Sequence, residues 1–275
     1  MKLCAVQLTS GSDWRTNLAE IKLRIINAVE AGSQLIVLPE NALLFDGKNM
    51  RVLVEQEQVQ DEIYATLTAL SQQNSVWIIL GSHPSLARPN GSVVQGKRVR
   101  QSCLVFSPIS GLCARYDKIH LFDVNVSDGV GKYKESDFIE PGDLTPVVID
   151  VDGVKVGLSI CYDLRFPELF RILVEMGAEL IVVPAAFTYV TGEAHWDVLL
   201  QSRAIENQVF LLGVNQCGYH TKIRQTYGHS VCYSPWGENL GQLENVPDNL
   251  YVEIDTNRIL ECKTSMPVLE HRRFI

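Results

Sequence analysis

One cysteine in this sequence stands at a position where it could act as a nucleophile. Cys161 follows the apolar run at residues 154–160, which has the length of a buried strand, and it precedes Pro167, which favours the first turn of a helix. A turn from strand to helix exposes a side chain beside the N–H groups that open the helix. Those groups can stabilise a thiolate and hydrogen-bond an oxyanion. We therefore weigh a partly ionised nucleophile against a buried structural cysteine.

Two charged residues follow other predicted strands. Glu40 comes directly after the apolar run at residues 34–39, and Lys118 lies just beyond a strand at residues 112–116. Either residue taken alone is most often structural or solvated. Together with Cys161 they offer a base, a cation and a thiol, the groups needed for nucleophilic attack on a carbonyl carbon. Spacing in the sequence does not establish that the three meet.

The elements that would position these residues alternate between strands and helices. Turn sequences with Gly or Asp-Gly separate these elements, and two hairpins are expected, across residues 107–111 and 152–153. This pattern predicts one domain over residues 1–275, with mixed sheets covered by helices. We expect strands at residues 2–8, 34–39, 76–81, 101–106, 112–116, 145–151, 154–160, 178–184, 209–215, 228–234 and 250–254, and helices at residues 14–31, 59–73 and 194–207 and after Pro167.

Three stretches have no regular pattern. Residues 83–100 are rich in Gly, Pro, Asn and basic residues and predict an exposed hairpin or loop. Residues 123–143 are polar and Gly-rich and predict a long functional loop, and residues 261–275 carry no strong signal.

Composition narrows the classes of function. The chain has 275 residues, of which 46% are hydrophobic and 20% charged, with a net charge of −8. The negative charge argues against nucleic acid or an anionic membrane as a partner. Seven cysteines without metal-site spacing favour a reducing compartment and predict no metal site. With neither a signal-peptide pattern nor a membrane-spanning run, the sequence predicts a cytoplasmic protein.

Three segments resemble the signature segments of the nitrilase superfamily of carbon–nitrogen hydrolases, in the family's order. They are Leu-Pro-Glu at residues 38–40, Tyr-Asp-Lys-Ile-His-Leu at residues 116–121 and Ser-Ile-Cys-Tyr-Asp-Leu-Arg at residues 159–165. Shorter matches lie at residues 135–136, 141–142, 195–196, 203–207 and 227–230, so the resemblance covers nearly the whole chain. Residues 216–218 and 267–272 resemble the branch that contains deaminated glutathione amidase and the omega-amidases.

The resemblance implies a four-layer αββα sandwich, a homodimer formed through a helical face, and catalysis without a metal or organic cofactor. Carried over by position, Glu40 is the general base, Lys118 the cation on the oxyanion side and Cys161 the nucleophile. Glu135 corresponds to a second glutamate that orients Lys118, and whether it also acts on the leaving group or water stays open.

The expected substrate is a small amide that carries a carboxylate. Arg165 and Thr191 are the candidates for binding that carboxylate, and the backbone N–H of Tyr162 is a candidate oxyanion donor. An ion-paired surface arginine is an equal alternative for Arg165.

The resemblance implies hydrolysis of deaminated glutathione to 2-oxoglutarate and cysteinylglycine. The alternatives are α-ketoglutaramate, another carbamoyl or nitrile substrate, and a non-catalytic interaction protein on the same scaffold. The loops at residues 45–51 and 123–134 are expected to decide between the two amides, because the amides differ only in the leaving amine.

Overall fold

Two six-stranded sheets form the centre of the molecule in the computed structural model, which describes residues 1–128 and 130–274. The first sheet has the order β16-β1-β2-β3-β4-β5 and the second β15-β14-β11-β10-β9-β8. The strands of the first sheet are β1 (Lys2–Gln7), β2 (Leu35–Val37), β3 (Trp77–Ser85), β4 (Arg100–Ser107), β5 (Gly111–Asp117) and β16 (Asp248–Glu253). Those of the second are β8 (Val148–Val151), β9 (Val154–Leu158), β10 (Leu180–Ala185), β11 (Phe210–Asn215), β14 (Val231–Tyr233) and β15 (Asn239–Gln242).

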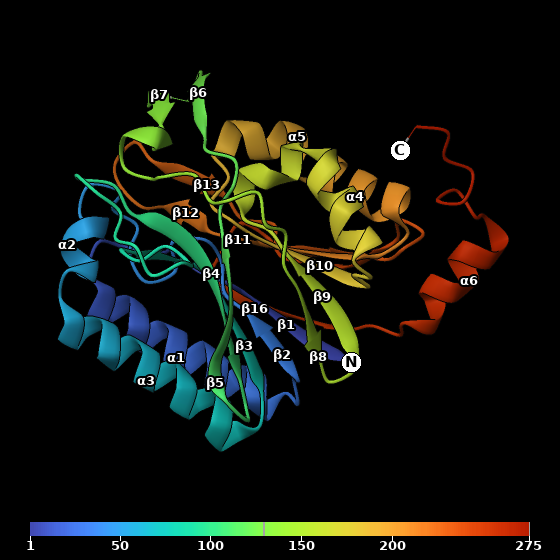
Figure 1. Cartoon of the computed structure of the whole chain (residues 1–275), viewed down its shortest axis with the longest axis horizontal. Coiled ribbons are helices and arrows are strands. Elements are labelled where there is room, and N and C mark those ends of the chain that lie inside the picture. Colours follow the sequence, from blue (N-terminus) through green and yellow to red (C-terminus); the bar gives the residue numbers. More distant parts are fainter. Residues whose placement is uncertain (129, 275) are drawn as a thin grey trace.

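Helices cover the outer face of each sheet (Figure 1). The helices are α1 (Trp14–Glu30), α2 (Met50–Val54), α3 (Glu57–Asn74), α4 (Pro167–Glu175), α5 (Tyr189–Asn207) and α6 (Asn257–Ser265). Helices α1 and α3 pack on the first sheet, α4 and α5 pack on the second, and α6 lies at one end of the molecule (Figure 1). The result is the four-layer αββα sandwich that the sequence predicted.

The alternation of side chains along β1 explains how the layers separate. Leu3 and Ala5 lie in the core between the two sheets, whereas Cys4 and Val6 face α1 and α3. Since successive side chains of a strand point to opposite faces, a strand buried on both faces must be apolar throughout. This is why the strands were recognisable as continuous apolar runs.

The central strands of both sheets are parallel. β1, β2 and β3 run parallel to one another, as do β9, β10 and β11, and antiparallel strands flank each group. Because the carboxyl ends of parallel strands lie at one edge of a sheet, the residues after β2, β9 and β10 gather at such edges. Two short hairpins, β6 (Asp123–Val126) with β7 (Gly131–Lys134) and β12 (Cys217–Tyr219) with β13 (Gln225–Tyr227), extend beyond the sheets.

Most expected elements are present, and the differences have local causes. β3 continues to Ser85, so Ser82 and His83 are buried and only the later part of residues 83–100 is an exposed loop. α5 begins at Tyr189, five residues before the expected start, because the Thr188 side chain caps it by accepting a hydrogen bond from the Thr191 N–H.

The remaining differences concern stretches that the sequence left unpatterned. Residues 123–143 hold the β6–β7 hairpin and a 3₁₀ turn, η1 (Glu135–Asp137), and helix α6 lies where no strong signal was found. Gly129 and Ile275 fall within these stretches and lie outside the described residues. None of the helices described is long and apolar enough to cross a membrane.

Candidate active site

The three residues expected to do chemistry meet at the carboxyl edges of the two sheets. Lys118 Nζ lies 2.7 Å from Glu40 Oε1, and 2.8 and 3.0 Å from the two carboxylate oxygens of Glu135. The Cys161 thiol faces the Glu40 side chain and the backbone N–H of Ala186. Residues separated by up to 121 positions in the sequence thus form one buried cluster of thiol, carboxylates and ammonium.

Cys161 adopts a backbone conformation that few non-glycine residues take. It opens the 3₁₀ turn η2 (Cys161–Arg165) with a φ of 48°. Cys161 thus lies on the turn between β9 and α4, and α4 begins at Pro167, as the sequence predicted. The tight turn lifts the side chain off the end of β9 and into the space between the sheets.

A buried carboxylate holds this turn in place. Asp163 accepts hydrogen bonds from the Ile160 N–H at 2.9 Å, the Tyr116 hydroxyl at 2.7 Å and the His120 N–H at 3.2 Å. The His120 ring nitrogen Nδ1 lies 2.7 Å from the same carboxylate. Tyr116 and His120 flank Lys118 in the sequence, so Asp163 ties the segment of the lysine to the segment of the nucleophile.

The environment of Cys161 favours the thiol over the thiolate. Burial raises its pKa well above the ordinary value and the Glu40 carboxylate raises it further, whereas Lys118 and the Ala186 N–H lower it. The raised pKa argues against the partly ionised thiol that the sequence suggested. Attack by Cys161 requires a base to remove its proton, and Glu40 is the carboxylate in position.

Lys118 is a charged ammonium in this site despite its burial. Burial alone would lower its pKa, but the Glu135 and Glu40 carboxylates hold the pKa well above the usual value. Burial raises the pKa of Glu135, against the opposing effect of Lys118. Glu135 also accepts a hydrogen bond from the Phe122 N–H at 2.6 Å, which fixes its orientation toward the lysine.

The loop after β2 is fixed by contacts with the second sheet. Gln216 donates a hydrogen bond of 3.0 Å to the Glu40 carbonyl and one of 2.8 Å to Ser10 Oγ. A Cβ atom on Gly81 would lie 2.1 Å from the Leu38 carbonyl oxygen, so only glycine lets β3 approach this loop so closely. Glu40 therefore has little freedom to move away from Lys118.

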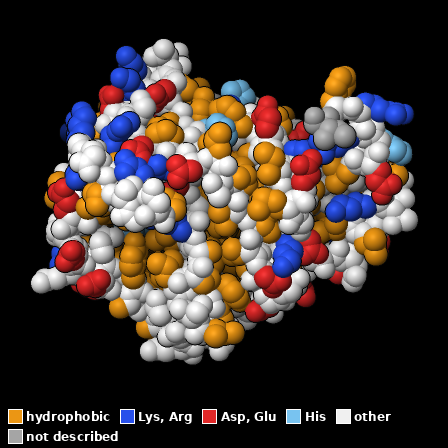
Figure 2. Space-filling view, viewed as in Figure 1, with side chains coloured by type: hydrophobic (Ala, Val, Ile, Leu, Met, Phe, Trp, Pro, Cys, Tyr) orange, Lys and Arg blue, Asp and Glu red, His pale blue; other side chains and the backbone are white. Residues whose placement is uncertain are grey.

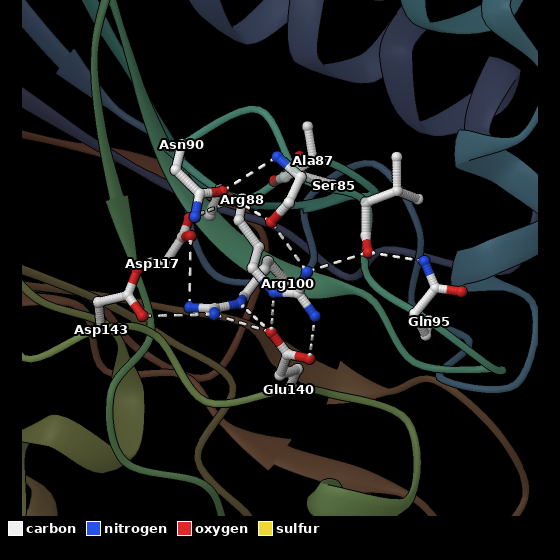
Figure 3. Close-up of polar contacts among 12 residues, drawn as sticks. Ser85, Ala87, Arg88, Asn90, Gln95, Arg100, Asp117, Glu140 and Asp143 are labelled. Carbon is white, nitrogen blue, oxygen red and sulfur yellow. Dashed lines mark hydrogen bonds and ion pairs between the residues drawn. The ribbon is translucent and has the colours of Figure 1, made fainter.

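A network of charges supports Lys118 from the other side. Arg88 and Arg100, from opposite ends of the loop after β3, converge on the Glu140 carboxylate at 2.7 Å each (Figure 3). Arg100 also lies 3.8 Å from Asp117, the residue before Lys118. The Gly142 N–H then donates to the Lys118 carbonyl at 2.7 Å. The network fastens the segment after Glu135 against the end of β5.

A cavity of about 670 Å³ opens above the cluster, and Glu40, Lys118, Glu135 and Cys161 line it. The loop after β2, the β6–β7 hairpin and the β12–β13 hairpin form its walls. Further lining residues are Ser12, Asn41, Phe45, Asp46, Gly47, Lys48, Met50, Phe122, Val130, Lys132, Tyr133, Lys134, Phe138, Ile139, Tyr162, Ala186, Phe187, Thr188, Thr191, His220, Thr221 and Arg224.

The residues expected to bind substrate divide into two groups. Thr191 and Tyr162 line the cavity, but Arg165 is not among the lining residues. Its guanidinium lies 5.9 Å from the Tyr162 ring centre and 5.4 Å from that of Phe187, and one nitrogen is 3.2 Å from His195 Nδ1. Arg165 thus stands behind two rings that line the cavity.

Four further side chains line the cavity, and the sequence analysis identified none of them individually, although Phe45 and Tyr133 lie in the loops at residues 45–51 and 123–134 that it named. Tyr133 and Arg224 are joined by a hydrogen bond of 2.6 Å, and Phe45 stacks on His220 with ring centres 3.6 Å apart. None belongs to a motif with a recognisable spacing. Only their shared position around one opening identifies them.

The geometry suits attack on a carbonyl carbon. A thiol beside a carboxylate can be deprotonated during attack, and a buried ammonium together with backbone N–H groups can stabilise the negative charge that develops on oxygen. No chain motion is needed to assemble the four charged or nucleophilic groups, because fixed elements of both sheets hold them.

Comparison with known proteins agrees with this chemistry. The family model described as carbon-nitrogen hydrolase matches residues 2–264. The chain is 42% identical over 271 residues to a protein of Yersinia enterocolitica named deaminated glutathione amidase, covering 98% of this chain and 92% of that one.

Solved structures give the same fold. The C. elegans NitFhit protein superposes with a TM-score of 0.89 at 32% identity, over 99% of this chain and 65% of that longer chain. The Saccharomyces cerevisiae protein Nit3, a member of branch 10 of the nitrilase superfamily, superposes with a TM-score of 0.86 at 27% identity, over 100% of this chain and 97% of that chain. From the cavity with its thiol, carboxylates and ammonium, and from these matches, the chain belongs to the carbon–nitrogen hydrolase family.

Proposed function

We propose that this protein is an amidase that hydrolyses deaminated glutathione to 2-oxoglutarate and cysteinylglycine. The observation that carries the proposal is the Cys161 thiol between Glu40 and Lys118 at the base of a cavity. Relatives that bear the name deaminated glutathione amidase and are 32–42% identical over nearly the whole chain favour this amide among those the chemistry allows.

The first half of the reaction forms a thioester. Glu40 removes the thiol proton as Cys161 Sγ attacks the amide carbon, and Lys118 and the Tyr162 N–H stabilise the oxyanion. The tetrahedral intermediate then collapses, the carbon–nitrogen bond breaks and Glu40 returns its proton to the leaving amine. Cysteinylglycine departs, and the 2-oxoglutaryl group remains on sulfur.

The second half restores the enzyme. Glu40 takes a proton from water, the hydroxide attacks the thioester carbon, the carbon–sulfur bond breaks, and Glu40 returns the proton to sulfur, which gives 2-oxoglutarate and the Cys161 thiol. Glu135, by holding Lys118 through two hydrogen bonds, positions the cation for both oxyanions.

On the acyl side we assign the carboxylate to Thr191, which lines the cavity, and keep Arg165 as a second candidate although it lies behind the Tyr162 and Phe187 rings. His195, one turn after Thr191 along α5, lies 3.2 Å from the Arg165 guanidinium. Thr191 and the histidine that contacts Arg165 therefore share one face of α5. The alternative for Arg165 is a purely structural stacking role.

We further propose a homodimer in the cytoplasm. Helices α4 and α5 leave Ile172, Val198 and Ile205 between 43% and 64% exposed, which favours a partner on this face. The seven cysteines, all within the described part of the chain, are free thiols, as a reducing compartment favours.

The experiment is a comparison of kcat/KM for deaminated glutathione and α-ketoglutaramate with purified protein, following 2-oxoglutarate. We expect the dipeptide-bearing amide to be preferred, and Cys161→Ala to hydrolyse neither. A preference for α-ketoglutaramate would indicate an omega-amidase, and a wild-type protein inactive on both would overturn the proposed substrate class.

The same assay tests Arg165. Arg165→Ala should lower kcat/KM for both amides alike, by about tenfold or more, because they share the acyl carboxylate. Lys222→Ala, which removes an exposed cation that does not line the cavity, is the matched control. If Arg165→Ala matches this control, the acyl carboxylate binds elsewhere.

A further inference from the structure

The mouth of the cavity carries more positive charge than the rest of this acidic protein would suggest. Apart from the catalytic cluster and Lys134, which pairs with Asp137, the charged lining residues described are Lys48, Lys132, Arg224 and one carboxylate, Asp46. Figure 2 shows Lys and Arg side chains, with Asp and Glu side chains among them, on the side of the molecule where the β6–β7 hairpin forms one wall of the cavity. Because the whole protein has a net charge of −8, it does not steer anions toward itself at long range. The local excess of positive charge must therefore attract an anion by short-range contacts.

Arg224 is the best placed of these cations. One guanidinium nitrogen donates to the Tyr133 hydroxyl at 2.6 Å and another to the Ala186 carbonyl at 3.2 Å. The guanidinium also lies 4.7 Å from the centre of the Tyr133 ring and 5.7 Å from that of Phe45. These contacts hold the side chain in one orientation at the junction of three loops.

The donors of Arg224 are only partly used. A guanidinium has five N–H groups, and the two hydrogen bonds above account for two of them. Within residues 1–128 and 130–274, no carboxylate lies within ion-pair distance of Arg224. A fixed arginine with free N–H groups at a cavity wall is suited to a carboxylate ligand, which it can bind through two parallel hydrogen bonds.

The turn that carries Arg224 is itself rigid. His220 Nδ1 lies 2.7 Å from the Ser10 carbonyl, to which it must donate, and Nε2 accepts from the Thr226 hydroxyl at 2.7 Å. Burial lowers the pKa of His220 to about 4, so the ring is neutral and keeps this pattern at physiological pH. The Arg224 carbonyl accepts from the His220 N–H at 2.9 Å, which closes the turn.

Arg224 and the nucleophile contact the same residue of the cavity lining. The Ala186 N–H faces the Cys161 thiol, and the Ala186 carbonyl accepts from Arg224. A cysteinylglycine leaving group places its terminal carboxylate about 7 Å from the scissile nitrogen when extended, by the reach of two residues. A leaving group of this length can extend from the nucleophile toward the guanidinium.

We propose that Arg224 binds the terminal carboxylate of the leaving dipeptide and so selects an anionic leaving group. The proposal rests on the proposed function and deepens it, by assigning the side of the site that recognises the departing amine. Lys48 and Lys132 contribute longer-range attraction, while Tyr133 fixes the orientation of the guanidinium.

The test uses two substrates that differ only at this carboxylate. Deaminated glutathione ends in a glycine carboxylate, and its glycinamide analogue replaces that group with a neutral amide while keeping the acyl part and the scissile bond. The wild-type enzyme should prefer the carboxylate by about 10- to 100-fold in kcat/KM, the range expected for charge-assisted hydrogen bonds. The preference should reside in KM, because this carboxylate keeps its charge throughout the reaction.

In Arg224→Ala the ratio of kcat/KM between the two substrates should lose most of its value, and only the small part due to Lys48 and Lys132 should remain. Arg224→Lys should keep part of the preference, because it retains charge without the two-pronged geometry. Lys222→Ala, which removes a cation from the same turn outside the cavity, should keep the wild-type ratio. Thermal unfolding measures whether Arg224→Ala is folded. If it is not, Arg224→Gln replaces it in the comparison.

Each other outcome has a definite meaning. Equal losses on both substrates in Arg224→Ala would place Arg224 at the acyl carboxylate and overturn the proposal. A wild-type enzyme that hydrolyses both compounds equally well would also overturn it, while leaving the proposed function in place. Failure of the wild-type enzyme to hydrolyse either compound would overturn the proposed function itself, and this inference with it.

Discussion

Cys161 lies between a carboxylate that opposes its ionisation and an ammonium that favours it. Burial and Glu40 raise the pKa of Cys161, which favours the thiol over the thiolate in the resting site. In the proposed mechanism, Glu40 therefore removes the thiol proton at the moment of attack. This arrangement also makes the reactivity of Cys161 toward alkylating reagents a different property from its ability to turn over an amide.

Glu40→Gln should separate those two properties. Turnover should fall by at least about 10²-fold, because a neutral amide cannot accept the thiol proton. The pKa of Cys161 should nevertheless fall, since the substitution removes a negative charge that raises it and leaves Lys118, which lowers it. The rate of iodoacetamide labelling of Cys161 should therefore rise with pH over a lower range than in the wild-type protein.

Peptide mapping after limited labelling, repeated across pH, checks this result. Glu135→Gln is the matched control: it should slow turnover while leaving Cys161 open to alkylation. Full activity in Glu40→Gln would contradict the mechanism, and so would a labelling midpoint shifted to higher pH.

At the scale of elements, the loop between β3 and β4 owes its position to Glu140. The Glu140 carboxylate accepts hydrogen bonds from both Arg88 and Arg100, and these hydrogen bonds lower the pKa of Glu140 to about 2. Its ordinary value is 4.5, so the folded protein binds this proton less readily than the unfolded chain. Stability from Glu140 is therefore present above about pH 4.5 and is lost as the pH falls toward 2.

Glu140→Gln should lower the free energy of unfolding by about 2–4 kcal/mol at neutral pH, because it leaves the buried Arg100 without its main partner. The decline in stability between pH 4.5 and 2 should become shallower than in the wild-type protein. Urea unfolding at several pH values measures both effects.

Lys155→Gln is the control, because it breaks an exposed pair with Asp150 in the β8–β9 hairpin, worth about 0.2–1 kcal/mol. Equal effects of the two substitutions would mean that the Arg88–Arg100–Glu140 network does not hold the loop. A fall in kcat with Glu140→Gln would in addition link the network to the position of Lys118.

At the scale of the molecule, one face differs from the rest. Val198 on α5 is 64% exposed, and Trp236, which lines a shallow cavity together with Ile205 of α5, is 55% exposed. The C-terminal tail packs near this face, where Arg272 forms an ion pair of 2.5 Å with Glu175 at the end of α4. An exposed apolar surface bordered by the C-terminal segment of the chain is typical of a two-fold interface.

We expect light scattering at micromolar concentration to give twice the chain mass of 30.8 kDa. Val198→Asp, and truncation after Cys262, should both shift the protein toward the monomer, because a buried charge or a lost tail weakens an apolar interface. Ile109→Asp, at an 87% exposed position on a turn of the first sheet, should leave the assembly unchanged. A monodisperse wild-type monomer would refute the dimer.

The sequence by itself determined the features that depend on short-range pattern. β1 and β10 were recognisable because burial on both faces makes them largely apolar, and α1 because its apolar side chains recur at helical spacing. Glu40, Lys118 and Cys161 were identified because each stands at the end of such a strand and within a family motif. These signals are local, so no coordinates were needed to find them.

Only the tertiary structure decided what depends on burial and on distant neighbours. The raised pKa of Cys161 follows from the position of Glu40, 121 residues earlier, and from the exclusion of water, neither of which a motif encodes. In the folded chain Arg165 lies behind the cavity wall. Arg224 lies at the mouth of the cavity, because loops from three parts of the chain converge there. Loop convergence is set by how the two sheets pack, and the free donors of Arg224 exist only in that packed arrangement.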